Sequence, residues 1–188
     1  MTDTTQPETK PWRIDASHSN VEFAVRHLMI STVKGRFAGV EGAVTIDERD
    51  PSRSAVDVTI DAASIDTRVE QRDQHLRSAD FFEVEKYPAI TFKSTHVARN
   101  GEGAFAVTGD LTIHGVTRSV TLAVAEEGRT RDPWGNDRVA FSASAKINRK
   151  DFGLHWNQVL EAGGVAVGDE IKIAIDVELM RQAAAQAA

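Results

Sequence analysis

The chain has 188 residues and no cysteine, with 22 Lys and Arg against 28 Asp and Glu, which gives a formal net charge of −6. The absence of cysteine excludes disulfide scaffolds, thiolate metal sites and cysteine nucleophiles. The acidic balance argues against a nucleic-acid-binding protein. A hydrophobic fraction of 41% is typical of a globular domain.

The two ends of the chain differ from the rest in composition. Residues 1–10 are polar and show neither the basic start nor the apolar core of a secretory signal, so we predict a disordered tail and a cytoplasmic protein. Residues 181–188 are rich in Ala and are predicted to form a flexible tail. One domain is expected between them, over 11–180. Stable membrane insertion is not expected, because no segment approaches the about 20 apolar residues of a membrane-spanning helix.

Alternation of apolar and polar residues with a period of two dominates the domain and is typical of strands with one buried face. It predicts about eight strands. Their apolar positions are Val21, Phe23 and Val25; Val40, Val44 and Ile46; Val56, Val58 and Ile60; Ile90 and Phe92; Phe105, Val107, Leu111 and Ile113; Val120, Leu122 and Val124; Val139, Phe141 and Ile147; and Ile171, Ile173, Ile175, Val177 and Leu179. Phe37 has the wrong parity for the strand near 35–47, and a bulge at Gly39 or Gly42 would reset it.

One segment breaks this alternation. Thr67 and Glu70 match a capping box, and apolar and charged residues follow at helical spacing, which predicts a short helix over 68–79. A second, weaker turn is predicted near 157–162. Gly115-Val116 predicts a two-residue type II′ hairpin loop between two strands. An all-β domain of this kind, with one or two short helices, packs as a sandwich or closes as a barrel whose open end a helix can cap.

The predicted inner faces offer almost no ionisable groups, and they include small residues at Ser94, Gly109, Ala143 and Ala145. An eight-stranded barrel is just wide enough to be filled by side chains or to hold one slender ligand. Small inward residues would leave such a barrel hollow. The alternative, in which they accommodate neighbouring side chains or the helix, stays open.

Motifs for catalysis or metal binding are weak. The six histidines are His18, His27, His75, His96, His114 and His155, and no pair has the spacing of a zinc site, so no metal is expected. Asp15, His18 and Ser19 suggest a triad, but no G-x-S-x-G elbow accompanies them.

Charged residues of the predicted helix are a second candidate site. Arg72, Asp73 and His75 fall within one helical turn. They either grip a polar headgroup at a cavity mouth or form ion pairs that fix the helix to the barrel rim. The run 148–153, which contains Arg149, is either a rim site or a strand-ending turn in which Asp and Gly act locally.

Four segments resemble the YceI-like family in sequence, order and spacing over 12–180. They read WRIDASHSNVEFAVRH, TRVEQRDQHLRSADFFEVEKYPAITFKS, TGDLTIHGVTRSVTL and INRKDFG. The resemblance implies an extended, eight-stranded, antiparallel lipocalin-like β-barrel whose apolar cavity holds a polyisoprenoid or similar amphiphile, such as an isoprenoid quinone, a prenyl pyrophosphate or a fatty amide. It implies no established enzymatic activity and no required cofactor, and it leaves a homodimer open. Many members are periplasmic and carry a signal peptide, which this sequence does not show.

The resemblance turns the candidate residues into an expected ligand site. The lipid tail is expected to contact Phe23, Val25, Ile90, Phe92, Leu111, Ile113, Leu122, Phe141, Ile173 and Ile175. The headgroup is placed at a mouth near the helix, against Arg72, Asp73, His75, His27 and Arg149.

Three functions follow from these expectations. The first is non-enzymatic binding, transport or storage of an isoprenoid lipid or fatty amphiphile. The second is a lipid-modifying hydrolase or isomerase that uses Asp73, His75 or His114 as acid or base. The third is a structural or stress-related dimer with a solid barrel.

Overall fold

The computed structural model describes residues 11–182, so the tails predicted for 1–10 and for 183–188 lie outside the described residues. The described chain is mainly strand. The strands are β1 (Trp12–Ile14), β2 (Asn20–His27), β3 (Ser31–Phe37), β4 (Val40–Thr45), β5 (Ala55–Asp61), β6 (Ile65–Asp66), β7 (Ala89–Arg99), β8 (Ala104–Ile113), β9 (Val116–Arg131), β10 (Asn136–Asn148) and β11 (Val167–Gln182). The helix α1 (Glu70–Arg77) follows β6. Strand β11 extends two residues into the tail predicted to begin at 181.

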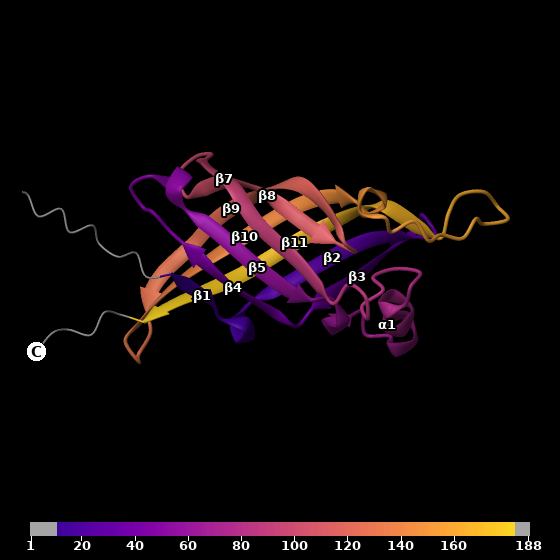
Figure 1. Cartoon of the computed structure of the whole chain (residues 1–188), viewed down its shortest axis with the longest axis horizontal. Coiled ribbons are helices and arrows are strands. Elements are labelled where there is room, and N and C mark those ends of the chain that lie inside the picture. The colour runs from indigo at the N-terminus through magenta and orange to yellow at the C-terminus, as the bar shows by residue number, and fades with distance from the viewer. Residues whose placement is uncertain (1–10, 183–188) are drawn as a thin grey trace, which may run out of the picture.

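Eight of these strands close into an antiparallel barrel. The sheet order is β1-β4-β5-β7-β8-β9-β10-β11-β2-β3-β6, and a further pairing of β1 with β11 completes the ring (Figure 1). This architecture confirms the predicted eight-stranded all-β barrel. Each ring strand turns one face inward, so the period-two apolar positions meet inside the barrel.

The remaining three strands branch from β11. One edge of β11 pairs with β2 between Val167 and Asp176, and then with β1 at Leu179 and Met180. The extra strands β2, β3 and β6 therefore extend the wall near α1, and a seam lies where β1 and β2 both leave β11 (Figure 1).

The strand predicted near 35–47 is two strands. Strand β3 ends at Phe37 and pairs with β2, whereas β4 begins at Val40 and pairs with β5. The parity of Phe37 is thus explained by a change of partner and not by a bulge. Gly39 makes this change possible, because a Cβ there would lie 2.9 Å from the Cβ of Asp61.

The predicted capping box is wrong. The helix begins at Glu70 after Val69, which has no side-chain cap. The amide and hydroxyl of Thr67 instead donate to the Asp73 carboxylate, at 2.9 and 2.5 Å. Arg68 has φ +64°, so the chain turns sharply before the helix starts.

Two predicted turns also differ. The loop between β8 and β9 is His114-Gly115, with φ of +52° and +71°, which is the type I′ pattern rather than II′. The turn predicted near 157–162 is present but not helical: the Gly163 amide donates to the Leu160 carbonyl at 3.0 Å, and a bridge between Val159 and Val165 flanks it. A short 3₁₀ turn lies earlier, at Arg149–Phe152.

Apolar side chains close the end of the barrel beside α1. The fully or nearly buried members of this group are Phe37, Ile65, Phe81, Phe152 and Leu154, with Leu76 of α1 and Phe82 packed against them. A smaller cluster of Trp12, Val139 and Leu179 lies where β1 meets β10 and β11. Within residues 11–182, no helix is long and apolar enough to cross a membrane.

Candidate functional site

A cavity of about 770 Å³ runs inside the barrel. That volume lies within the range of about 300–1,000 Å³ that is usual for small-molecule sites. A ten-residue strand such as β8 spans roughly 34 Å, so the barrel is long enough for an extended chain. The cavity shows that the barrel is hollow in its middle.

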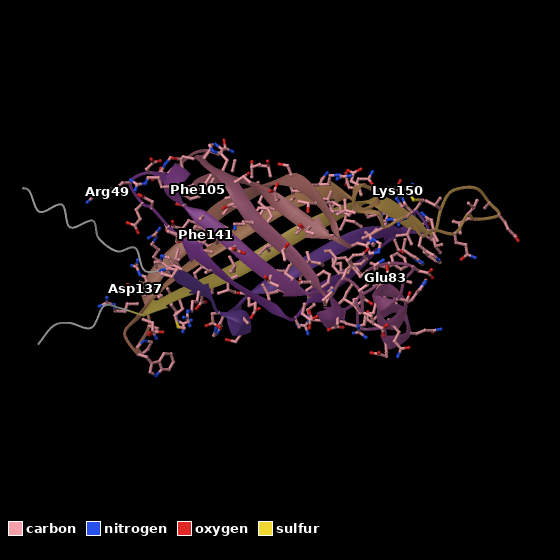
Figure 2. The ribbon with its side chains drawn as sticks, in the orientation of Figure 1. Arg49, Glu83, Phe105, Asp137, Phe141 and Lys150 are labelled. Carbon is pink, nitrogen blue, oxygen red and sulfur yellow. The ribbon has the colours of Figure 1, made fainter. Side chains whose placement is uncertain are left out.

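All ten residues predicted to contact a lipid tail line this cavity. They are Phe23, Val25, Ile90, Phe92, Leu111, Ile113, Leu122, Phe141, Ile173 and Ile175. Figure 2 places Phe141 and Phe105, a further lining residue, in the half of the barrel away from α1. Contact with a ligand stays a prediction, but these side chains provide a continuous apolar surface for one.

The four small residues have different roles, and one of them, Ala145, is partly buried but does not line the cavity. Ala143 lines the cavity. Gly109 lies behind a lining ring, because a Cβ there would be 2.6 Å from the Phe92 ring. Ser94 belongs to the wall, since its hydroxyl accepts a hydrogen bond from the Val56 amide at 2.8 Å. The ring of Phe23 lies over Gly35 in the same way. Because Gly35 and Gly109 have no side chains, the rings of Phe23 and Phe92 can lie against the sheet, which leaves space for the cavity.

The residues predicted to bind a headgroup beside α1 are occupied by protein contacts. Arg72 donates to the hydroxyl and carbonyl of Thr67, and Asp73 is buried against the same residue. His75 contacts Asp80 at 2.8 Å and packs edge-on against Trp156. None of the three lines the cavity, and neither does the exposed His27.

Arg149 does line the cavity, but the N–H groups of its guanidinium already donate to backbone carbonyls. The guanidinium is 3% exposed and donates to the carbonyls of Gly168, Leu154 and Trp156 at 2.7–2.9 Å. Its role is to join the start of the loop 153–166 to the first residues of β11. The structure therefore places four of the five predicted headgroup residues outside the cavity and the fifth in a backbone-binding role.

Charged side chains line the opposite end of the cavity. They are Asp47, Glu48, Arg99, Glu126 and Arg129, and we call this set the charged mouth. Glu127 also lies at this end, but its carboxylate accepts a hydrogen bond from the Ser142 hydroxyl on the outer face of β10. Figure 2 shows Arg49, which neighbours Glu48 in the β4–β5 loop, at the same end as Phe105. Glu48 and Arg99 are exposed, so the cavity reaches solvent here.

Strand bulges turn two of these charges inward. The register of β7 against β8 shifts between Ser94 and His96, so Val97 and Arg99 face the cavity. The register of β9 against β10 shifts at Glu127, so Arg129 faces inward opposite Val139. The alternation does not predict that Arg99 and Arg129 face inward, because each bulge reverses it. Glu126 keeps the parity of Leu122 and Val124 and was detectable from the pattern alone.

Arg129 links two sides of the charged mouth. It donates to both carboxylate oxygens of Glu126, at 2.6 and 3.0 Å, and it also pairs with Glu48. Strands β4 and β9 are four positions apart around the ring in either direction, so the Glu48–Arg129 pair spans the opening. The hydrogen bonds from Arg129 lower the pKa of Glu126, and those to Glu126 and Glu48 raise the pKa of Arg129.

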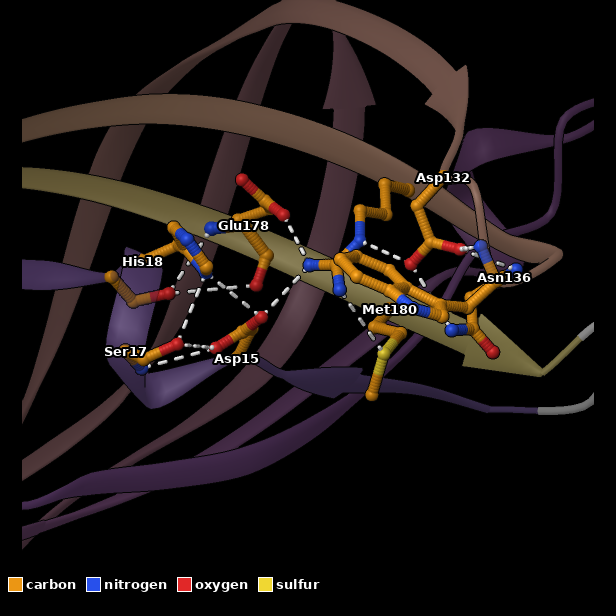
Figure 3. Close-up of polar contacts among 10 residues, drawn as sticks. Asp15, Ser17, His18, Asp132, Asn136, Glu178 and Met180 are labelled. Atoms are coloured by element: carbon orange, nitrogen blue, oxygen red, sulfur yellow. Dashed lines mark hydrogen bonds and ion pairs between the residues drawn. The ribbon is translucent and has the colours of Figure 1, made fainter.

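The predicted triad is not assembled as a catalytic one. Ser17 and Asp15 both contact the same ring nitrogen of His18, Nδ1, at 3.0 Å (Figure 3). A relay needs the serine and the carboxylate on opposite nitrogens. Ser19 instead exchanges hydrogen bonds with the backbone of Glu178.

Asp15, His18 and Glu178 have the spacing of metal ligands, but Arg138 already neutralises the two carboxylates. Among the described residues, Asp15, His18 and Glu178 present ligand atoms within 4.8 Å of one another. Arg138 pairs with Asp15 at 2.8 Å, with Glu178 and with Asp132 at 2.8 Å (Figure 3). Arg138 therefore holds β1, which closes the ring, to β10 and β11.

Replacing Arg138 with Met is expected to lower the melting temperature most at neutral pH. Hydrogen bonds from Ser17 and Arg138 lower the pKa of Asp15, and although burial opposes it, hydrogen bonds from Arg138 and Asn136 lower the pKa of Asp132 to about 2. Carboxylates with lowered pKa values stabilise the fold above their unfolded pKa, about 3.9, and that contribution is lost as the pH falls toward 2. Thermal unfolding at pH 7 and pH 3 measures the difference.

Arg131→Met is the matched control for this experiment. Its pair with Asp137 is exposed, and such pairs contribute little. Equal melting temperatures of the two variants at pH 7, or a deficit of Arg138→Met that does not shrink at pH 3, would contradict the assigned role of Arg138.

Comparisons with known proteins agree with this geometry. A profile described as the YceI-like domain matches residues 12–179. A UPF0312 protein of Serratia proteamaculans is 48% identical over 145 residues, which cover 76% of this chain and 75% of the relative. The crystal structure of BcnA from Burkholderia cenocepacia aligns over 88% of this chain and 98% of its own, with a TM-score of 0.77 and 24% identity. A structure described as a polyisoprenoid binding domain from Saccharophagus degradans aligns over 89% and 97%, with a TM-score of 0.65 and 16% identity. The chain belongs to the YceI-like family.

Proposed function

We propose that this chain binds the apolar tail of a polyisoprenoid, or of a similar long-chain amphiphile, inside the barrel and carries or stores it without chemical change. The observation that carries the proposal is the cavity itself, which is apolar along its wall, closed by aromatic side chains beside α1 and charged at its opposite end. Each buried methylene contributes about 0.8 kcal/mol before ordering costs, so a long tail supplies ample gross affinity. The description of the Saccharophagus degradans neighbour as polyisoprenoid binding supports the ligand class.

The proposal puts the lipid headgroup at the charged mouth. This end is open and carries polar side chains that face the bore. The α1 end is filled by Phe152, Phe81 and Leu154, a group that we call the aromatic plug. The side chains of Arg149 and Asp73 at this end are engaged with protein atoms. A lipid would therefore enter tail first, with its tip against this aromatic plug.

Catalysis on the bound lipid has little support. Asp73, His75 and His114 do not line the cavity. The inward carboxyl of Glu126 is paired with Arg129, which lowers its pKa and makes it a poor proton donor near neutral pH.

Displacement of a neutral fluorescent probe tests the proposal. N-phenyl-1-naphthylamine is bound to the full chain and then displaced by geranylgeraniol, a prenyl alcohol. The expected result is saturable displacement with one alcohol per chain. A probe that does not bind, or that the alcohol does not displace, would contradict a lipid-binding cavity.

A further inference from the structure

The hairpin between β9 and β10 carries an uncovered tryptophan. Trp134 is 82% exposed, the largest exposed fraction of any large apolar side chain in the described part of the chain. The other two tryptophans are packed: Trp12 is 3% exposed, and the ring centre of Trp156 lies 5.2 Å from that of Phe81. Among the described residues, one indole group is therefore open to a partner.

The hairpin lies beside the opening of the cavity. Strand β9 lines the charged mouth up to Arg129 and ends at Arg131, directly before the turn 132–135. In Figure 2, Asp137, which follows the turn, lies at the same end of the barrel as Arg49. A surface that covers the indole therefore lies close to the charged mouth as well.

Asp132 holds the turn in one conformation. Its carboxylate accepts hydrogen bonds from the amides of Trp134 and Asn136, at 3.0 and 2.9 Å, and pairs with Arg138 at 2.8 Å. Pro133 also restricts the backbone, because its ring fixes φ. The indole is thus presented by a fixed backbone, which lowers the entropy lost when a partner covers it.

Both carboxylates of the hairpin are paired. Asp132 pairs with Arg138, and Asp137 pairs with Arg131 and Arg181 at 3.2 and 3.3 Å. A lipid surface that approaches the indole therefore meets no uncompensated carboxylate on the hairpin.

The chemistry of this tip fits the interface of a lipid bilayer. An indole combines a large apolar face with an N–H donor, and tryptophan is accordingly enriched where membrane hydrocarbon meets water. The ligands proposed above are amphiphiles, which partition into bilayers. With the charged mouth at the bilayer, a headgroup stays at the interface while its tail moves between the hydrocarbon and the barrel, so the tail does not cross water.

We propose that the β9–β10 hairpin is a membrane-docking element, in which Trp134 inserts its indole into the headgroup region of a bilayer and brings the charged mouth to the bilayer surface. This inference rests on the proposed function, because docking serves to move the amphiphile between the bilayer and the cavity. The binding is reversible, since one aromatic side chain buries a limited apolar area.

A second group of exposed apolar side chains is the competing surface. It consists of Met29 and Ile30 in the β2–β3 turn and of Val159. A hydrogen bond from the Leu28 amide to the Ala166 carbonyl, at 2.9 Å, joins the two segments. They lie at the α1 end of the barrel, so docking through them would leave the charged mouth facing away from the bilayer (Figure 1).

Cosedimentation with phosphatidylcholine vesicles tests the docking. The full chain is expected to bind, and Trp134→Ala is expected to weaken the partitioning about tenfold or more, because it removes a large apolar group. The control Ile30→Ala, Val159→Ala removes apolar surface at the α1 end and is expected to bind as the unmodified chain does. No binding by the unmodified chain, or a loss in the control as large as in Trp134→Ala, would overturn the inference.

Uptake from vesicles separates docking from ligand binding. Trp134 does not line the cavity, so Trp134→Ala is expected to bind dispersed geranylgeraniol normally but to take it up from vesicles severalfold more slowly. Equal uptake rates would overturn the inference, whereas an unmodified chain that does not bind the dispersed alcohol would overturn the proposed function instead. A dimer that Trp134→Ala dissociates, seen by native mass spectrometry, would show that a second copy covers the indole and would also overturn the inference.

Discussion

Replacing Ala143 with Trp is expected to raise the dissociation constant for geranylgeraniol about a hundredfold or more, which corresponds to a loss of roughly 2.7 kcal/mol. Ala143 lies on β10 between Phe141 and Ile147, on the face that lines the cavity. The bore of an eight-stranded barrel is wide enough for one slender ligand, so an indole group inside it leaves no room for the tail. Probe displacement by geranylgeraniol measures the effect.

Ser144→Trp is the matched control for the blocked cavity. Ser144 is the next residue of the same strand, and its side chain is exposed on the outer face. It is expected to bind the alcohol as the unmodified chain does. If Ala143→Trp also bound the alcohol normally, the ligand would have to occupy another place.

Replacing Phe152 with Ala is expected to lower the free energy of unfolding by about 3–5 kcal/mol. Phe152 is 1% exposed and belongs to the aromatic plug beside α1. Truncation would remove its packing and leave a void that the short turn Arg149–Phe152 cannot fill, because Arg149 fixes that turn to neighbouring carbonyls. The melting temperature should fall by roughly 6–20 °C.

Phe105→Ala serves as the comparison for this variant. Phe105 is half-buried near the charged mouth, so the same truncation is expected to cost less. Equal losses of stability at the two positions would show that the α1 end is not the tightly packed end of the barrel.

The barrel was predictable because strand faces repeat with a period that the sequence displays. Ile171, Ile173 and Ile175 alternate with polar residues, and each lines the cavity as expected. The pattern fails where the backbone departs from regular pairing. The register shift between Ser94 and His96 brings Arg99 inward, and the shift beside Glu127 does the same for Arg129.

The residues predicted to bind a headgroup are engaged by protein atoms for a reason that the alternation does not contain. Residue types such as Arg72, Asp73 and Arg149 suit a headgroup site and a structural hydrogen-bond network equally well, and the sequence does not show which partners they meet. In the folded chain, Asp73 contacts Thr67, and Arg149 donates to carbonyls of the loop 153–166 and of β11. These partners depend on where α1 and the loop lie, which period-two alternation does not encode.

Native mass spectrometry most directly tests whether the barrel holds a lipid tail. The full chain is stripped by organic extraction, incubated with geranylgeraniol and compared with the Ala143→Trp variant under the same conditions. The predicted spectrum shows one alcohol per chain for the unmodified protein and none for the variant, and it also reports the oligomeric state. Equal adducts on both proteins, or no adduct on either, would contradict binding in the barrel cavity.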